Sequence, residues 1–348
     1  MPISTALART RAEVAEPISS RDVSALAADG EVRVVQASSP LTRRSWERLN
    51  AELFPRRPEL QLRVYGFYSS GCDLSFASAM SNVRHFAADC LQHATNVESL
   101  AALPALESLS IGIFDLESFG VLEHVGAGLT RLSLGATRSR KPSLAPLRRF
   151  VGLRELYLEG QQKEIEVLAQ LDALEDLTLR SIYTPDLRHL AGLGRLRSLD
   201  VKLGGIRDFS ALRELGALAY LELWQIRGLG DISVVSDLAS LQNLFLQSLP
   251  RVASLPRLER CGRLRRIVLQ NLRGLRDLSA LEWAPALEEF VLLQGEASAP
   301  EELAPVLRNP NVARVGAFFG SDARNRSFAA MAEASGKAQF QWTPFEYR

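Results

Sequence analysis

Residues 196–224 read LRSLDVKLGGIRDFSALRELGALAYLELW and contain the pattern that decides the fold. The phrase L-x-x-L-x-L, with valine accepted at its last position, begins at Leu196 and returns at Leu218. In the L-x-L part, alternate side chains point to the same side, as they do in a strand. Between the two phrases, apolar residues recur every third position from Phe209 to Leu215, as in a short helical or 3₁₀ turn. The stretch therefore predicts a strand, a tight turn and a second strand.

The same phrase repeats along most of the 348-residue chain. Its first apolar residue stands at positions 83, 106, 129, 153, 174, 196, 218, 241, 264, 287 and 312, so successive copies are 21 to 25 residues apart. No single copy can bury its apolar face alone, whereas stacked copies bury a continuous ladder of leucines. The period predicts a solenoid in which each repeat packs only on its neighbours.

These repeats resemble the leucine-rich-repeat superfamily, whose period is roughly 20–29 residues. The short period, together with the D-[LFI]-S segments that begin at Asp208, Asp231 and Asp277, most resembles the internalin-like class. The resemblance implies an α/β solenoid shaped as a horseshoe, with a parallel sheet on the concave face, short helical or 3₁₀ turns on the convex face and caps at both ends. It also implies a role in binding other proteins. We expect the aspartate and serine side chains of these segments to cap the turns.

One column departs from the family pattern. The asparagine that the family places five residues after the second leucine is absent, and residues such as Gln161, Ile182 and Leu249 stand there instead. The backbone at this corner must therefore find other hydrogen-bond partners. Gly120 and Gly126 also replace leucines, which predicts a different path for the turn before Leu129.

The sequence divides into four parts. We predict a flexible N-terminus at 1–20, an N-terminal cap with a helix and a first strand at 21–73, about eleven repeats at 74–318 and a C-terminal cap or tail at 319–348. The tail is rich in aromatic residues and is expected to cover the last repeat. A partner-binding tail is the alternative.

The side chains between the leucines of each strand should face outward on the concave sheet. We predict that twelve of them form a partner-binding surface. They are Glu155, Tyr157, Asp176, Asp200, Tyr220, Glu222, Trp224, Phe245, Val268, Val291, Leu293 and Phe318. Exposed apolar clusters rimmed by charge commonly mark interaction sites, and the carboxylates favour a basic partner. The alternative is that the C-terminal segment folds back and covers the apolar part.

The arginines at 257, 260, 263, 265 and 266 form a basic cluster in the tenth repeat. We expect a solvated convex ridge, and a phosphate or acidic partner is the alternative.

Composition narrows the functional class. Lysine plus arginine (41) nearly balances aspartate plus glutamate (40), so no general attraction to nucleic acid or anionic membranes is expected. No secretory leader or long apolar span is visible, and the three cysteines show no disulfide pattern. These features favour a cytoplasmic protein, and the Ala/Arg/Leu-rich usage is typical of bacteria.

No catalytic, metal-binding or cofactor-binding motif is visible in the sequence. We therefore predict a non-catalytic protein-binding module without a cofactor, and in its specific form an inhibitor or immunity-type protein. Two alternatives remain. One is a homo-oligomeric scaffold, and the other is an enzyme with a site in the N-terminal cap at Cys72, Cys90 and His93.

Overall fold

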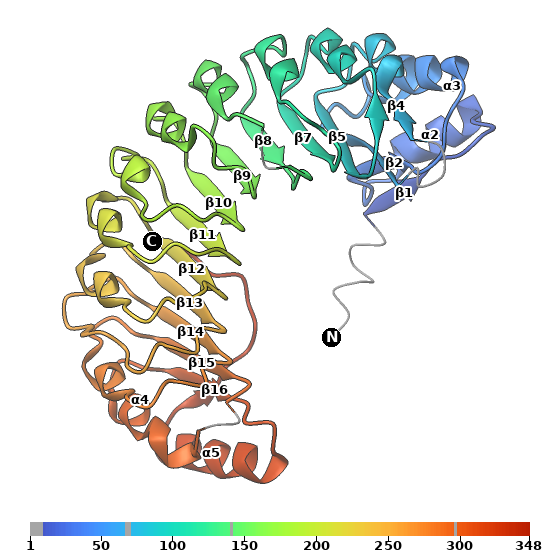
Figure 1. Cartoon of the computed structure of the whole chain (residues 1–348). Helices are drawn as coiled ribbons and strands as arrows, with labels where there is room; N and C mark the ends of the chain where they lie inside the picture. Colours follow the sequence, from blue (N-terminus) through green and yellow to red (C-terminus); the bar gives the residue numbers. More distant parts are fainter. Residues whose placement is uncertain (1–9, 67–70, 140–141, 296–297) are drawn as a thin grey trace. The chain divides into compact units, whose positions relative to one another are not determined.

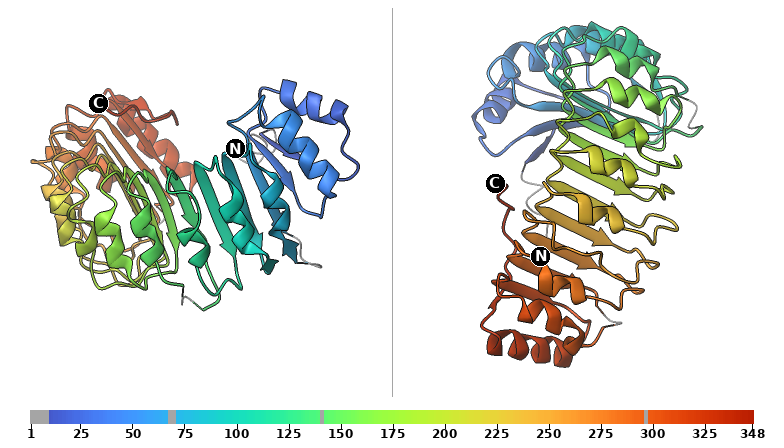
Figure 2. Two further views of the ribbon diagram at one scale, coloured as in Figure 1. Left: turned by 90° about the horizontal axis from the view of Figure 1, so that it is seen from above. Right: turned by 90° about the vertical axis from the view of Figure 1, so that its left-hand side faces the viewer.

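The computed structural model describes residues 10–66, 71–139, 142–295 and 298–348. The chain forms two compact units, the first ending at Leu171 and the second beginning at Asp172. In both, parallel strands alternate with short helical turns that lie on one side of the strands (Figures 1 and 2). The predicted solenoid of parallel strands and 3₁₀ turns is confirmed.

In the described part of the first unit, the main sheet pairs its strands in parallel in the order β1-β2-β3-β5-β7-β8-β9. Their bounds are β1 Arg11–Glu13, β2 Val34–Ala37, β3 Gln61–Gly66, β5 His85–Leu91, β7 Ser108–Ile113, β8 Arg131–Leu134 and β9 Glu155–Glu159. A two-stranded sheet pairs β4 (Cys72–Asp73) with β6 (Ala94–Thr95). The 3₁₀ turns are η2 Leu74–Ala79, η3 Val97–Ala102, η4 Gly120–Glu123, η5 Ala145–Arg149 and η6 Ile165–Gln170.

The second unit continues the pattern with strands in the order β10 to β17. They are β10 Asp176–Arg180, β11 Ser198–Lys202, β12 Tyr220–Trp224, β13 Asn243–Gln247, β14 Arg266–Gln270, β15 Glu289–Leu293, β16 Arg314–Ala317 and β17 Ala338–Gln339. Their helical connections are η7 Arg188–Leu190, η8 Ser210–Glu214, η9 Ser233–Asp237, η10 Ser279–Trp283, η11 Pro300–Leu303, α4 Ala304–Arg308 and α5 Asp322–Ala334.

The leucine columns form the core of both units. The strand leucines and the apolar residues of the turns are almost all buried, as the repeat pattern predicts. The turn before Leu129 follows a shifted path: Phe119, Leu122 and Val125 are buried, one residue earlier than the columns of the other repeats. The glycines therefore shift the helical turn without removing it.

Side-chain caps begin several turns, as expected. The backbone N–H of Ser210 donates to Asp208 Oδ1 at 2.8 Å, and that of Ser233 donates to Asp231 Oδ1 at 2.8 Å. Each bond satisfies an N–H group that the turn itself leaves unpaired.

At the corner that lacks the asparagine column, backbone N–H groups form hydrogen bonds with the neighbouring repeat. The residue that follows each strand from β10 to β15 has a positive φ, for example 51° at Gln225 and at Ser248. In this conformation the N–H of Gln225 donates to the carbonyl of Gln247, and the N–H of Ser248 donates to that of Gln270, both at 2.9 Å. In the first unit the buried Gln161 side chain donates to the carbonyl of Gly135 at 2.9 Å. Backbone pairing and one glutamine thus replace the asparagine ladder.

Both ends carry additional helices. The first unit begins with β1, α2 (Ser20–Ala28), β2, α3 (Arg43–Arg48) and a π-helical turn, η1 (Leu49–Leu53). Because β1 pairs with β2, the ordered part of the cap begins inside the range 1–20 that we predicted as flexible. At the other end β17 pairs with β16 after α5, and the following segment returns past β15 and β14 (red in Figure 1). Among the helices of the described residues, none combines the length and the apolar character needed to cross a bilayer.

Candidate functional site

The outer sheet face of the second unit is the face of β10–β16 that points away from the leucine core. Strand register aligns its side chains in three rows. The middle row contains Thr178, Asp200, Glu222, Phe245, Val268, Val291 and Gly316. The register therefore brings the acidic and apolar residues of the prediction side by side in one row.

Two carboxylates and one lysine form the polar end of this face. Lys202 Nζ lies 3.1 Å from Asp200 Oδ2 and 3.2 Å from Glu222 Oε2. Tyr220 donates its hydroxyl to Glu222 Oε2 at 2.9 Å. One ammonium group thus serves two carboxylates, so this cluster carries excess negative charge.

Burial and the repulsion between neighbouring carboxylates change the pKa values in this cluster. Burial, followed by the negative charge of Glu222, raises the pKa of Asp200. Burial also raises the pKa of Asp176 and of the Tyr220 hydroxyl. Among the described residues no donor reaches the buried Asp200 Oδ1. This oxygen is itself shielded from solvent, whereas Asp200 as a whole, Lys202 and Trp224 are each partly exposed.

Trp224 lies at the edge of this cluster and is partly exposed. Arg180 Cζ and Lys202 Nζ each lie 6.0 Å from the centre of its ring, at the outer limit of a cation–π contact. A partly exposed indole beside charged groups is a common kind of anchor in protein interfaces.

The C-terminal segment covers the apolar end of the same face. Phe340 is only 8% exposed and packs with Val268 and Val291, while Phe245 and Leu293 pack against this cluster. Phe245, Val268, Val291 and Leu293 belong to the predicted partner-binding set. The folded-back segment that we considered as the alternative therefore occupies this half of the face.

Polar contacts hold this segment in place as far as Arg348. Gln242 donates its side-chain N–H to the carbonyl of Arg348 at 2.6 Å and accepts the N–H of Arg348 at 2.8 Å. Arg265 donates to the carbonyl of Glu346 at 2.7 Å. The ring of Phe345 lies 5.3 Å from the guanidinium carbon of Arg265 and 5.0 Å from that of Arg266. The segment is thus bound through both backbone and ring contacts.

Arg266 belongs to a buried ion pair at the base of this segment. Its guanidinium contacts the carboxylate of Glu289, and both side chains are 7% exposed. Arg314 contacts the other oxygen of Glu289 at 2.5 Å, and Arg266 also donates to the carbonyl of Thr343 at 3.3 Å. The expected solvated ridge is therefore wrong for Arg265 and Arg266, whose charges pair with glutamates and hold the C-terminal segment.

The remaining predicted residues do not join this cluster. Glu155 and Tyr157 belong to the first unit, where Tyr157 donates its hydroxyl to Glu159 Oε2 at 3.0 Å. Phe318 follows β16 and is 46% exposed. The sequence identified which side chains face outward but not which of them the chain itself covers.

The N-terminal cap offers little evidence of a nucleophilic cysteine. Burial raises the pKa of the Cys72 thiol to about 12, so this thiol stays protonated near neutral pH. His93 Nδ1 pairs with Asp115 at 2.6 Å, and the exposed Cys90 lies near Arg63.

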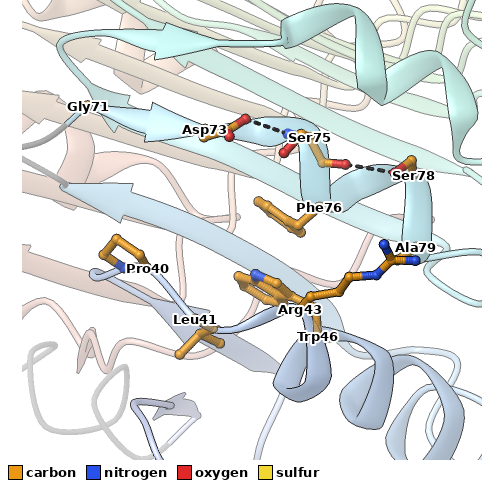
Figure 3. A pocket seen from close by; sticks show the side chains of 10 residues that line it. All are labelled: Pro40, Leu41, Arg43, Trp46, Gly71, Asp73, Ser75, Phe76, Ser78 and Ala79. Atoms are coloured by element: carbon orange, nitrogen blue, oxygen red, sulfur yellow. Dashed lines mark hydrogen bonds between the residues drawn. The ribbon is translucent and has the colours of Figure 1, made fainter.

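A cavity of about 660 Å³ opens beside the N-terminal cap (Figure 3). Trp46 and Phe76 stack along it, with ring centres 4.0 Å apart. Pro40, Leu41 and Arg43 line the same cavity. This lining can bind an apolar group but offers no obvious acid–base pair.

No protein-family model and no curated protein sequence matches this chain. Among solved structures, the chain is similar to internalin inlF of Listeria monocytogenes, with 19% identity, a TM-score of 0.57, and 89% of this chain and 87% of that chain covered. It is also similar to a leucine-rich-repeat protein of Leptospira interrogans, with 14% identity, a TM-score of 0.51, and 89% and 90% covered. A third match is the mouse RP105/MD-1 complex, with 16% identity and a TM-score of 0.56, where 89% of this chain aligns with 59% of that chain. The chain therefore has the leucine-rich-repeat fold that these structures share.

Proposed function

We propose that this protein is a non-catalytic protein-binding module that engages its partner on the outer sheet face of the second unit. The observation that carries the proposal is the partly exposed Trp224 beside two carboxylates that share one lysine. The excess negative charge attracts a basic side chain of a partner, and the indole supplies apolar contact. The solved structure of mouse RP105 with MD-1 is a precedent for a protein partner on this fold.

The chemical character of the partner follows from the part of the outer sheet face that the C-terminal segment leaves uncovered. Because Phe340 covers Val268 and Val291, the apolar half of the face is already occupied. The half around Trp224 is polar and acidic and is only partly covered: Glu222 is buried, whereas Trp224 and Asp200 are partly exposed. Tyr347 of the C-terminal segment lies near this half, since burial and the negative charges of Asp176 and Asp200 raise the pKa of its hydroxyl. We therefore propose a basic partner segment, with Trp224 as the main anchor.

The test compares two tryptophans. Trp224→Ala removes the proposed anchor, whereas Trp283→Ala changes a 63% exposed tryptophan on the turn η10 of the same unit. A partner captured from an extract of the source cells should be retained by the wild type and by Trp283→Ala but lost by Trp224→Ala. Truncation of an interface tryptophan typically costs about 2 kcal/mol or more, which is roughly thirtyfold in affinity. Equal capture by both variants would rule out this face.

A finer form of the proposal is that the partner is an enzyme that the module inhibits, as an immunity protein does. In that case the activity of the captured protein should fall as wild type is added and stay constant with Trp224→Ala. The proposal also includes a reducing cytoplasmic setting, which the three free cysteines support. Recovery of a disulfide-linked form from source cells would contradict this setting.

The homo-oligomeric alternative relied on an open apolar patch. Coverage of Val268 and Val291 by Phe340 leaves a smaller apolar area for self-association. Light scattering over a range of concentrations distinguishes the two, because the proposal predicts a constant mass and the alternative predicts a rising one.

A further inference from the structure

A second feature of the second unit lies where its strands end. A cavity of about 730 Å³, here called the corner groove, follows the corners of five successive repeats, from β10 to β14. Its lining residues are Tyr183, Leu203, Gly204, Gln225, Ile226, Arg227, Gly228, Ser248, Pro250, Arg251, Asn271 and Arg273. These residues lie beyond the strand ends and are distinct from the three rows of the outer sheet face.

The corner groove carries uncompensated positive charge. Arg227, Arg251 and Arg273 come from three successive repeats, all three are exposed, and no Asp or Glu is among the lining residues. Within the described part of the chain none of the three forms an ion pair. Other arginines of this unit, such as Arg213 and Arg308, do pair with carboxylates. Three unpaired guanidinium groups along one groove attract anions.

The groove also presents neutral donors. Asn271 donates its side-chain N–H to Ser248 Oγ at 3.0 Å, and Arg273 Nε donates to Asn271 Oδ1 at 3.1 Å. These bonds leave the second N–H of the Asn271 amide and the other N–H groups of Arg273 for a ligand. Because the corner N–H groups of Gln225 and Ser248 donate to the next repeat, ligand recognition here must come from side chains.

One end of the groove is closed by an aromatic ring. The Tyr183 ring lies so close to Gly205 that a Cβ added there would be 2.7 Å from Tyr183 Cδ1. The glycine therefore permits this position of the ring, which provides an apolar wall beside the basic side chains. The groove combines this wall with guanidinium, amide and hydroxyl groups.

We propose that the corner groove binds a small oligoanion that carries sulfate or phosphate groups. Neighbouring strands lie about 4.8 Å apart, so arginines one or two repeats apart can bind anionic groups about 5–10 Å apart. A guanidinium binds an oxyanion through two parallel N–H···O bonds. A tetrahedral oxyanion offers three terminal oxygens to donors from different repeats, whereas a carboxylate offers two. The arrangement of donors therefore favours sulfate or phosphate over carboxylate.

Titration calorimetry of the full chain with two probes, sucrose octasulfate and inorganic tripolyphosphate, tests the proposal. The groove variant is the triple substitution Arg227→Gln/Arg251→Gln/Arg273→Gln. The matched control, Arg195→Gln/Arg257→Gln/Arg260→Gln, removes the same charge from exposed arginines outside the groove. Circular dichroism checks that both variants keep the wild-type fold.

We expect saturable binding of at least one probe to the wild type, weakened as salt rises from about 50 to 200 mM because charge contacts dominate. The groove variant should lose more than about tenfold in affinity, since hydrogen bonds to charged groups contribute about 1.5–3 kcal/mol each. The control should change less than about threefold, as expected for screened charges. The probe that binds more tightly identifies the group as sulfate or phosphate.

Three results would overturn the proposal: no binding of either probe, equal losses in the two triple variants, or equally tight binding of hexaglutamate. The first excludes an anion site, the second indicates general charge attraction, and the third removes the preference for tetrahedral groups. None depends on Trp224, so the outcome is separate from the test of partner binding.

Discussion

Replacement of Phe340 by alanine tests how firmly the C-terminal segment is bound to the second unit. A buried aromatic side chain removes about 150–250 Å² from water, and at about 25 cal/mol per Å² this sets an upper bound near 4–6 kcal/mol. Phe→Ala substitutions in cores cost about 3–5 kcal/mol. Because this segment can detach locally, we expect about 3 kcal/mol, lost from the segment and not from the whole unit.

Hydrogen exchange measures this local loss. The N–H of Phe340 donates to the carbonyl of Val315, and that of Ala338 donates to the carbonyl of Ala313, both at 2.9 Å. A loss of 3 kcal/mol should speed exchange at residues 338 and 340 by about a hundredfold. Amides in β12 and β13 should keep their protection, because they belong to the leucine stack.

The matched control is Phe318→Ala, which changes a 46% exposed phenylalanine near the same end of the unit. It should leave exchange at residues 338 and 340 within about threefold of the wild type, in line with the small effect of most surface substitutions. Unchanged exchange in Phe340→Ala, or the same acceleration in both variants, would refute the view that Phe340 anchors the segment.

Three further predictions concern the second unit. Arg266→Ala should lower the free energy of unfolding by about 1.5–3 kcal/mol in urea titrations, because the buried Glu289 then keeps only Arg314 as its ion-pair partner, whereas Arg314→Ala, with a 46% exposed side chain, should cost about 1 kcal/mol or less. Gly204→Ala should lower the thermal midpoint, because its Cβ would lie 2.3 Å from a backbone oxygen, whereas Gly194→Ala has nothing within 4 Å and should not. Burial raises the folded-state pKa of Asp200 above 3.8. The wild type therefore gains stability as the pH falls through that pKa toward 3.8, because the folded state takes up the proton first. The stability of Asp200→Asn relative to the wild type should decrease between pH 7 and pH 4.

The repeat pattern predicted the strands, the turns and the buried columns because these depend on neighbours one repeat away. The pair Arg266–Glu289 could also be predicted, since β14 and β15 place the two residues in register. The helical turn at 120–123 was harder to predict from the sequence, because its apolar residues keep their three-residue spacing but are shifted by one position.

The course of the C-terminal segment could not be predicted in this way. Its contact between Gln242 and Arg348 joins residues 106 positions apart, and no period relates them. Gln242 reads as an ordinary polar residue before a strand, and the arginines at 265 and 266 read as a solvated ridge. The aromatic residues of the segment indicated that it covers something, but they did not specify whether it covers the last repeat or the sheet face.

The position of this segment changes which partner the protein is suited to bind. The sequence placed aromatic, aliphatic and acidic side chains on one surface and left open whether the C-terminal segment covers the apolar part. The chain itself covers Val268 and Val291, so a partner finds Trp224 beside carboxylates that share a single lysine. An apolar partner would have to displace Phe340 from Val268 and Val291. A basic partner can instead approach the partly exposed Trp224 and Asp200 while Phe340 stays in place. We therefore propose a basic partner because of the negative charge of the uncovered surface more than because of its aromatic residues.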